Sequence, residues 1–245
     1  RSLSGEALLE RLATAGIAGL GGAAFPTAVK LGLARSAGVD LLVLNGAECE
    51  PWICCDDALM RERAADVVLG AQVMLAACGA DRCAIAVEDD KPQAVAALAE
   101  ALAAAADARL GVISLPAVFP LGAEGPLVTA VTGREVPHDG LPPQVGVVCQ
   151  NVGTAASVAR LVQDGLPVVS RIVTVTGSGV RSPANVEVRL GTPITELIAA
   201  CGGTTGGDRR LIAGGSLTGR ALDDDAAPVT KGLNCVLVAT PGDLS

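Results

Sequence analysis

A glycine-rich segment near the N-terminus carries the densest group of residues suited to ligand chemistry. It reads GLGGAAFPTAVK over residues 19–30. Small residues let a backbone approach a ligand closely, and Pro26 suits the first turn of a helix, whose free N–H groups favour an anion. Lys30 adds a positive charge one turn later. The segment therefore predicts a phosphate-binding loop; a tight helix-to-helix turn is the alternative, and neither a Rossmann nor a Walker motif is present.

A second polar group follows an apolar run of strand length, residues 39–44. It reads NGAECEPWICCDD, and ligands of open α/β sheets bind beyond the carboxyl ends of strands. Glu48 and Glu50 suit hydrogen bonds to the ribose or amide groups of a nucleotide, whereas Asp56 or Asp57 is more simply a helix cap. Solvated acidic side chains are the alternative. Carboxylate-pair hydrolysis fits less well, because no Ser, His or metal motif accompanies the acids.

Two weaker segments also lie between expected strands and helices. GAEGP, residues 122–126, either closes over a ligand or is an ordinary connection. QNVGT, residues 150–154, offers a second site for an anion or a flavin edge, with Thr154 as a structural cap in the simpler interpretation. The single histidine, His138, lies in a loop rich in Pro and Gly and cannot form a common zinc site, so we predict no metal site.

Apolar runs and helical periodicity indicate the elements that position these segments. Expected strands cover residues 39–44, 83–87, 109–115 and 145–149, and expected helices cover 4–15, 57–78, 92–106 and 154–162. Continuous apolar strands between helices favour a mainly parallel sheet covered on both faces. We therefore predict an α/β domain over residues 1–165.

The last 80 residues have a different pattern. Expected strands cover 171–176, 186–190, 210–213 and 234–239, with one helix over 193–200 that is capped by Thr192. Four strands around one helix predict a small β-grasp-like domain over residues 166–245.

Composition excludes several classes of protein. The 245 residues are 50% apolar and carry a net charge of −8, with two Phe, one Trp and no Tyr. Negative charge and scarce aromatic residues make nucleic acid an unlikely partner. The uncharged stretch 12–29 contains four glycines and a proline, which disfavour a membrane span. Without a leader or a CxxC pair among eight cysteines, we expect a soluble cytoplasmic fragment with mostly buried, reduced thiols.

Five motifs in this order resemble the C subunit of the Rnf electron-transport complex and, more distantly, the flavin subunit of respiratory complex I. They are GLGGAAFPTAVKL, NGAECEPWICCDDALMRERA, TGREVPHDGLPPQVGVVCQNVGTA, RIVTVTGSGVRSPANVEVRLGTP and PVTKGLNC. The resemblance covers nearly the whole chain. It implies an α/β fold with a modified Rossmann-like FMN-binding domain, followed by a small β-grasp domain of the soluble-ligand-binding (SLBB) kind.

The resemblance also assigns residues to FMN and to NADH as substrate. In the glycine loop these are Gly19, Gly21, Gly22, Ala23, Phe25 and Lys30, with Lys30 near the flavin phosphate. Beyond the loop they are Asn45, Glu48, Glu50, Glu124, Asn151 and Thr154, and Glu48 is our candidate catalytic residue. The implied chemistry is hydride transfer from NADH to the flavin, in which the protein stacks the two rings.

Departures from the family pattern bear on NADH more than on FMN. Ala24 replaces a glycine of the loop, Gly125 stands where a lysine usually follows Glu124, and Leu33 occupies an adenine-stacking position. The resemblance places 4Fe-4S clusters only in a domain after residue 245.

The implied role is an NADH-oxidising flavin module of a membrane-associated, ion-translocating complex. Its expected partners are other Rnf-type membrane and iron-sulfur subunits, and its expected place is peripheral, on the cytoplasmic side of the inner membrane. Two alternatives remain at this point: a cobalamin-reductase-type flavoprotein, and a scaffold subunit that has lost nucleotide binding.

Overall fold

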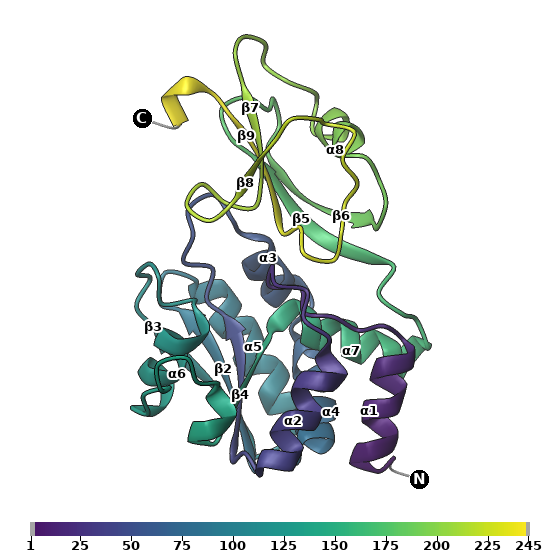
Figure 1. Ribbon diagram of the computed structural model, residues 1–245, viewed down its shortest axis with the longest axis vertical. Helices are drawn as coiled ribbons and strands as arrows, with labels where there is room; N and C mark the ends of the chain where they lie inside the picture. The colour runs from purple at the N-terminus through teal and green to yellow at the C-terminus, as the bar shows by residue number, and fades with distance from the viewer. Residues whose placement is uncertain (1–2, 244–245) are drawn as a thin grey trace.

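The chain folds into two lobes that meet at a narrow junction (Figure 1). The computed structural model describes residues 3–243. The larger lobe holds a parallel sheet wrapped by helices, and the smaller holds a mixed sheet with one α-helix. Within the described residues, no helix combines the length and hydropathy required to cross a bilayer.

The larger lobe alternates strands with helices, as predicted. Its strands are β1 (Leu41–Gly46), β2 (Arg82–Glu88), β3 (Leu110–Leu115) and β4 (Val147–Asn151). Its helices are α1 (Gly5–Thr14), α2 (Thr27–Ala37), α3 (Cys55–Glu62), α4 (Ala64–Cys78), α5 (Pro92–Ala105), α6 (Glu124–Thr132), the 3-10 helix η1 (Pro142–Val145) and α7 (Val152–Asp164).

All four strands are parallel, in the order β3-β2-β1-β4. Alternate residues of β1 enter two different cores: Leu42 and Leu44 pack with α4, α5 and α7, whereas Leu41 and Val43 pack toward α6 and η1. Strands buried on both faces require continuous apolar runs, because the side chains alternate between the faces. The predicted α/β class with a two-sided parallel sheet is confirmed.

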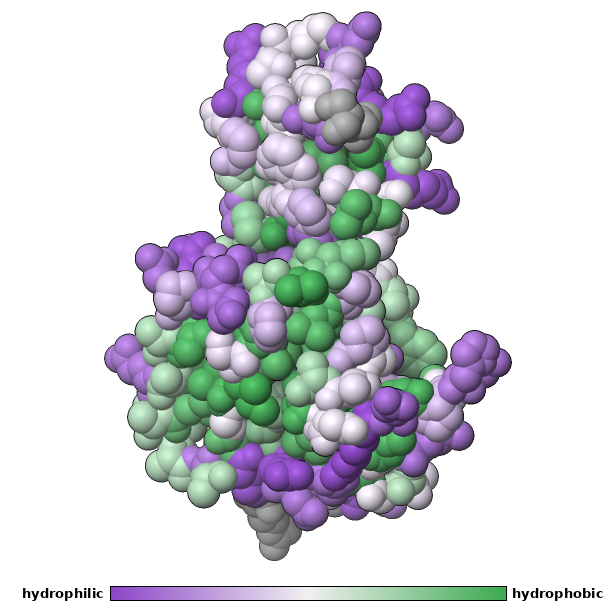
Figure 2. All heavy atoms as spheres, turned by 90° about the vertical axis from the view of Figure 1, so that its left-hand side faces the viewer, coloured by the Kyte–Doolittle hydropathy of each residue, from purple (hydrophilic) through white to green (hydrophobic). Residues whose placement is uncertain are grey.

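The surface beside β3 and α6 is markedly apolar (Figure 2). Large side chains exposed in the loops that flank these elements include Val118, Phe119 and Leu141. Because β3 is an edge strand, its outward residues are only half buried.

The predicted helix over residues 57–78 was wrong in one respect. The structure divides it into α3 and α4 at Arg63, whose φ of −134° is not helical. Arg63 instead pairs with Glu187 of the smaller lobe at 2.5 Å. Because no Gly or Pro marks this break, the apolar periodicity predicted one continuous helix.

Two predicted helix starts also need correction. Pro26 precedes α2 as its N-cap instead of lying in its first turn. Pro193 and not Thr192 is the N-cap of α8, and it offers no side-chain hydrogen bond.

The smaller lobe is a five-stranded sheet in the order β6-β5-β9-β7-β8. Its elements are β5 (Ser170–Thr176), β6 (Ala184–Arg189), α8 (Ile194–Ala200), β7 (Arg210–Ala213), β8 (Arg220–Leu222), β9 (Cys235–Ala239) and η2 (Pro241–Asp243). Residues of α8 pack on β5 and β9 in a separate core. The four predicted strands are present, and the three-residue β8 was missed because it is too short to show a pattern.

One very close helix contact in the larger lobe depends on Gly70. A Cβ atom built on Gly70 of α4 would overlap the backbone carbonyl of Ala155 in α7. The two helices therefore pack backbone against backbone at this point, which sets the position of α7 and of the residues at its N-terminus.

We predict that Gly70→Ala lowers the free energy of unfolding by about 1–3 kcal/mol, the usual cost of overpacking a dense core. The matched control is Gly32→Ala in the middle of α2, where the nearest atom to the new methyl group is 3.8 Å away. That change should stabilise the helix by about 0.5–1 kcal/mol. Urea unfolding curves provide both values, and equal midpoints for the two variants would contradict the packing argument.

Candidate functional site

A cleft of about 450 Å³ opens at the carboxyl ends of β1 and β4. Asn45, next to the last residue of β1, and Asn151, the last residue of β4, are direct register partners. After β1 the chain moves away from β4, first to β2 and then to β3. It returns to β4 from that far edge, so no connection fills the space between the carboxyl ends of β1 and β4. Ligands of open α/β sheets bind at such a switch point, and the volume is typical of small-molecule sites.

The cleft brings most of the predicted site residues together. The predicted residues in its lining are Gly19, Gly21, Ala23, Phe25, Lys30, Asn45, Glu48, Glu50, Glu124 and Asn151. Gly22 lines an adjoining groove beside the smaller lobe. Thr154 is fully buried behind the loop and reaches the cleft only through Leu20.

The glycine loop connects α1 to α2 and has unused hydrogen-bond donors. Gly19 N donates to Phe25 O at 2.8 Å, which closes the loop on itself. Among the contacts of residues 3–243, none is donated by the backbone N–H groups of residues 21–25, and Pro26 provides no side-chain cap for α2. Free N–H groups beside an open helix N-terminus favour an anion. The geometry fits the phosphate loop better than the alternative of a plain turn.

Ala24 adopts a backbone conformation that is unusual for alanine. Its φ is +50°, in the left-handed region. Glycine occupies this region without steric cost, whereas a Cβ makes it unfavourable. The departure noted in the sequence therefore places a small strain inside the loop.

The N-cap of α7 is Asn151 and not Thr154, which the simpler interpretation had made the cap. The Asn151 side chain is the N-cap of α7 and accepts from Gly153 N at 2.8 Å and Thr154 N at 3.3 Å. Thr154 Oγ1 instead accepts from Leu20 N at 2.9 Å. The prediction of Thr154 as a cap was wrong, because α7 begins at Val152, so Asn151 holds the N-cap position and Thr154 lies inside the first turn.

Lys30 lies in the cleft but already has a charged partner. Its Nζ is 2.5 Å from Glu124 Oε1, and both side chains are partly exposed. Glu124 is the first residue of α6 and comes from the opposite wall. A phosphate bound in the cleft therefore has to compete with Glu124 for Lys30, or share it.

Asn45 connects two walls of the cleft. Its Nδ2 donates to Gly122 O at 2.8 Å, and its Oδ1 accepts from Ala47 N at 3.0 Å. A Cβ at Gly122 would lie 2.8 Å from Ala47 O. The GAEGP segment thus packs directly on the loop after β1. Phe119, three residues before this segment, is 47% exposed in the cleft wall.

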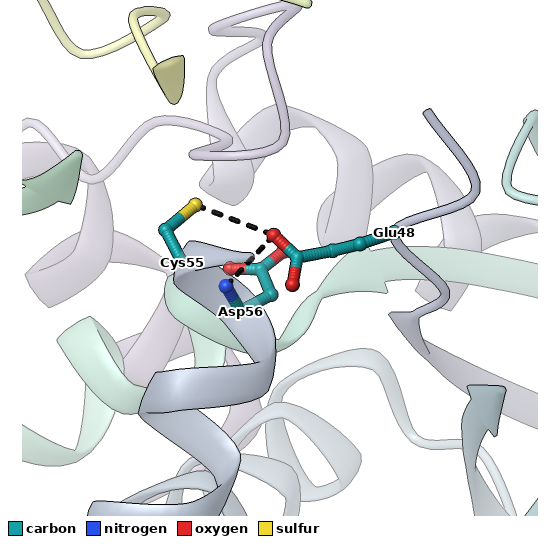
Figure 3. Close-up of side chains that lie close together, drawn as sticks. All are labelled: Glu48, Cys55 and Asp56. Carbon is teal, nitrogen blue, oxygen red and sulfur yellow. Dashed lines mark hydrogen bonds between the residues drawn. The ribbon is translucent and has the colours of Figure 1, made fainter. Parts of the chain in front are cut away.

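Glu48, Cys55 and Asp56 form a cluster on the floor of the cleft (Figure 3). Glu48 accepts from Asp56 N at 2.9 Å, from Asp57 N at 2.7 Å and from the Cys55 thiol at 3.4 Å. Asp56 accepts from Asn151 Nδ2 at 2.5 Å. Glu48, seven residues before the helix, therefore caps α3 from outside, and the expectation that Asp56 or Asp57 provides the cap was wrong.

Two acids so close together cannot both lose their protons easily. Burial, followed by the nearby Asp56 carboxyl, raises the pKa of Glu48 to about 8, although its hydrogen bonds to backbone N–H groups act in the other direction. Burial likewise raises the pKa of Asp56, opposed by Asn151 and Arg171. The pair therefore retains one proton near neutral pH. The three donor atoms lie within 4.8 Å of one another, the spacing of a metal site, but both Glu48 oxygens are engaged in capping α3.

Glu50 lines the cleft and also ties the two lobes together. Its Oε1 accepts from Leu217 N and Thr218 N at 2.7 Å each, and its Oε2 accepts from Thr218 Oγ1 at 2.6 Å. Its carboxylate therefore faces the smaller lobe in this structure.

Several cleft residues were missed by the sequence analysis. Gln150 is 6% exposed, and its Nε2 is buried with no hydrogen-bond partner among the described residues. Such an orphaned donor in a cleft wall is the kind of group that a ligand oxygen satisfies. Thr218 and Asn234 reach the cleft from the smaller lobe. Gln150 lies in the QNVGT segment that the sequence analysis singled out, although Gln150 itself was given no role there. No local signal marks Thr218 or Asn234.

The cysteines are mostly buried, as expected. All eight are free; six are buried, and only Cys54 is exposed. His138 is almost fully exposed and contacts Asp139 at 3.0 Å.

Family models match both lobes. Residues 12–160 match the Nuo51 FMN-binding domain, and residues 172–221 match the SLBB domain. The first match covers more than half of the chain and the whole wall that the larger lobe contributes to the cleft.

Curated proteins similar to this chain belong to ion-translocating complexes. The C subunit of the ion-translocating oxidoreductase complex of Pseudomonas aeruginosa is 45% identical over the whole chain, which covers 31% of that protein. The C subunit of the Na(+)-translocating ferredoxin:NAD(+) oxidoreductase complex of Acetobacterium woodii is 42% identical over 97% of the chain and 53% of its own length. The chain thus spans about a third to a half of these relatives.

Solved structures share the fold. Crystal structures of an NAD+-reducing [NiFe]-hydrogenase, in the H2-reduced and air-oxidized states, align with a TM-score of 0.80 at 24% identity. Each alignment covers 96% of this chain and 46% of the hydrogenase chain. With the parallel sheet and the predicted resemblance to the Rnf family both confirmed, the chain belongs to the Nuo51 FMN-binding domain family, here joined to an SLBB domain.

Proposed function

We propose that this chain is the NADH-oxidising flavin module of an Rnf-type ion-translocating oxidoreductase complex, with FMN in the cleft between β1 and β4. The observation that carries the proposal is the set of unused donors around one cavity: the N–H groups of residues 21–25, the open N-terminus of α2 and the buried Nε2 of Gln150. An anionic, oxygen-rich ligand satisfies all of them.

Different residues of the cleft suit different parts of FMN. Residues 21–25 and Lys30 suit the phosphate; Asn151 and Gln150 suit the polyol chain or ring edge; Phe25 and Phe119, both about half exposed, suit the ring faces. When bound, FMN supplies a ring that accepts a hydride from NADH and releases electrons singly. The chain's own part is to bind and orient both nucleotides, and Glu48 with Asp56 holds a proton beside them.

The division of the chain and its setting follow from this role. We place the boundary between the flavin domain, residues 1–165, and the SLBB domain, residues 166–245, in the connection between α7 and β5. In the complete protein, electrons leave to iron-sulfur clusters outside this chain, next to membrane and iron-sulfur subunits, on the cytoplasmic side of the membrane. The relatives' names and lengths support this setting.

The direct test is titration of the purified chain with FMN, followed by NADH under anaerobic conditions. The proposal expects a yellow protein that bleaches with NADH. Protein that stays colourless with added FMN would overturn the flavin site and favour a scaffold. Yellow protein that ignores NADH but accepts another reductant would overturn the NADH-oxidising role and favour a cobalamin-reductase-type protein.

We predict that Lys30→Ala weakens FMN binding by about 1.5–3 kcal/mol, the usual contribution of a hydrogen bond to a charged group. Riboflavin, which lacks the phosphate, should bind both proteins equally. Glu124→Gln, which removes the competing carboxylate 2.5 Å from Lys30, should strengthen FMN binding relative to riboflavin. Flavin fluorescence quenching measures each affinity. Equal losses for FMN and riboflavin in Lys30→Ala would show that Lys30 does not contact the phosphate.

We predict that Glu48→Gln slows flavin reduction by NADH more than it weakens FMN retention, because Glu48 lies on the cleft floor. Rapid-mixing absorbance measures the reduction rate, and equilibrium titration measures FMN affinity. The opposite result would assign Glu48 to the flavin and not to the nicotinamide nucleotide.

Stability should also depend on pH through the same residue. Since the pKa of Glu48 is raised from 4.5 to about 8 on folding, its contribution is complete at acid pH and is lost as pH rises through about 8. Melting temperatures measured from about pH 5 to about pH 9 should therefore fall less steeply in Glu48→Gln than in the wild type. Parallel profiles would rule out a shared proton at this site.

A further inference from the structure

Arg171 crosses the junction between the two lobes. It lies in β5 of the smaller lobe and is 5% exposed. Its guanidinium donates to Lys231 O, to Ile172 O at 3.2 Å and to Leu20 O at 2.9 Å, and Leu20 belongs to the glycine loop of the other lobe. Burying an arginine costs desolvation free energy. Here the hydrogen bonds of the buried guanidinium go to backbone carbonyls and not to a single acid.

The backbone N–H and the backbone carbonyl of Leu20 are both held by buried side chains. Thr154 accepts from its N–H at 2.9 Å, and Arg171 donates to its carbonyl at 2.9 Å. These partners lie 134 and 151 residues further along the chain. The peptide groups on either side of Leu20 are therefore held in fixed orientations immediately before residues 21–25, whose N–H groups have no partner among the described residues.

Other parts of the smaller lobe support the same loop. Lys231 Nζ donates to Gly16 O at 2.6 Å, and Arg171 in turn holds the Lys231 carbonyl. A Cβ at Gly232 would lie 2.8 Å from Gly22 O, so the two backbones touch. The loop is thus braced at Gly16, Leu20 and Gly22 by the smaller lobe.

The chemistry of the side chain favours arginine at this position. A planar guanidinium directs several N–H groups at separate carbonyls at once, whereas a lysine ammonium acts as a point charge. Burial lowers the pKa of Arg171, and the nearby Cys55 and Asp56 side chains oppose that shift electrostatically. Through its hydrogen bonds, Arg171 connects the glycine loop to the smaller lobe.

We propose that Arg171 is a positioning residue of the flavin site, which holds the carbonyl of Leu20 so that the N–H groups of residues 21–25 stay free for the phosphate. The SLBB domain is then a working part of the cofactor site and not only a docking module. This inference rests on the proposed function, because it assigns the loop to a bound phosphate.

The test compares Arg171→Met and Arg171→Lys with the control Arg181→Met. Arg181 is exposed in the same lobe and donates to Thr204 O at 2.9 Å, away from the junction. We expect Arg171→Met to weaken FMN binding about tenfold, the loss of one hydrogen bond from a charged donor. Arg171→Lys should restore part of the affinity, and Arg181→Met should behave as the wild type. Unchanged affinity in Arg171→Met would overturn the proposal.

Amide hydrogen exchange of the FMN-free proteins separates positioning from loss of domain contact. Within residues 16–25, Arg171→Met should speed exchange of the hydrogen-bonded amides of Ile17, Gly19 and Leu20. It should leave Leu217 and Thr218, whose amides Glu50 holds, as protected as in the wild type. Faster exchange in both segments would mean that the lobes separate, and unchanged exchange in residues 16–25 would mean that the loop needs no brace. Either result overturns the proposal.

The exchange measurement needs no flavin, so it also distinguishes the two hypotheses. If the wild type fails to bind FMN while Arg171→Met still loosens residues 16–25, the flavin function fails and the brace stands as a property of the fold. If Arg171→Met does not fold, Arg171→Lys gives the same comparison, with partial loosening expected and wild-type exchange contradicting the inference.

Discussion

The structure depends on the gap that a parallel sheet leaves where its strand order reverses. β1 and β4 are neighbours, yet the chain leaves β1 for β2 and returns to β4 only after β3 and α6. No connection crosses between their carboxyl ends, so Asn45 and Asn151 face a space that the fold itself cannot fill. Everything else in the site is arranged around that space: the glycine loop on one side, the GAEGP segment on another, and the smaller lobe above.

The acid cluster shows how the same residues serve the fold and the site. Glu48 caps α3, and Asp56 holds Asn151, which caps α7. Two helices therefore begin at the cleft with their first N–H groups satisfied by side chains that also line it. α2 and α6 also begin at the cleft, and neither N-terminus has a side-chain cap. Uncapped helix N-termini leave backbone N–H groups without side-chain partners, in contrast to those of α3 and α7.

Local sequence predicted the parts of the site that are contiguous in the chain. The strands of the larger lobe were predictable because both faces are buried, which forces continuous apolar runs such as residues 41–44. The loop of residues 19–25 was predictable from its small residues. The break at Arg63 was not, because no Gly or Pro marks it and Glu187, the partner of Arg63, lies 124 residues away. The cap by Glu48 and the brace by Arg171 were hidden for the same reason: their partners are close only in the folded chain.

Because Thr218 and Asn234 contribute to the cleft wall, the boundary of the flavin-domain family match differs from the boundary of the cleft. The match to the Nuo51 FMN-binding domain ends at residue 160, but the last residue that faces the cavity is number 234. The segment that matches the flavin-domain family is thus smaller than the unit that encloses the cavity. Exchange of the smaller lobe for another sequence would therefore rebuild one wall of the cavity, even with every residue up to 160 kept.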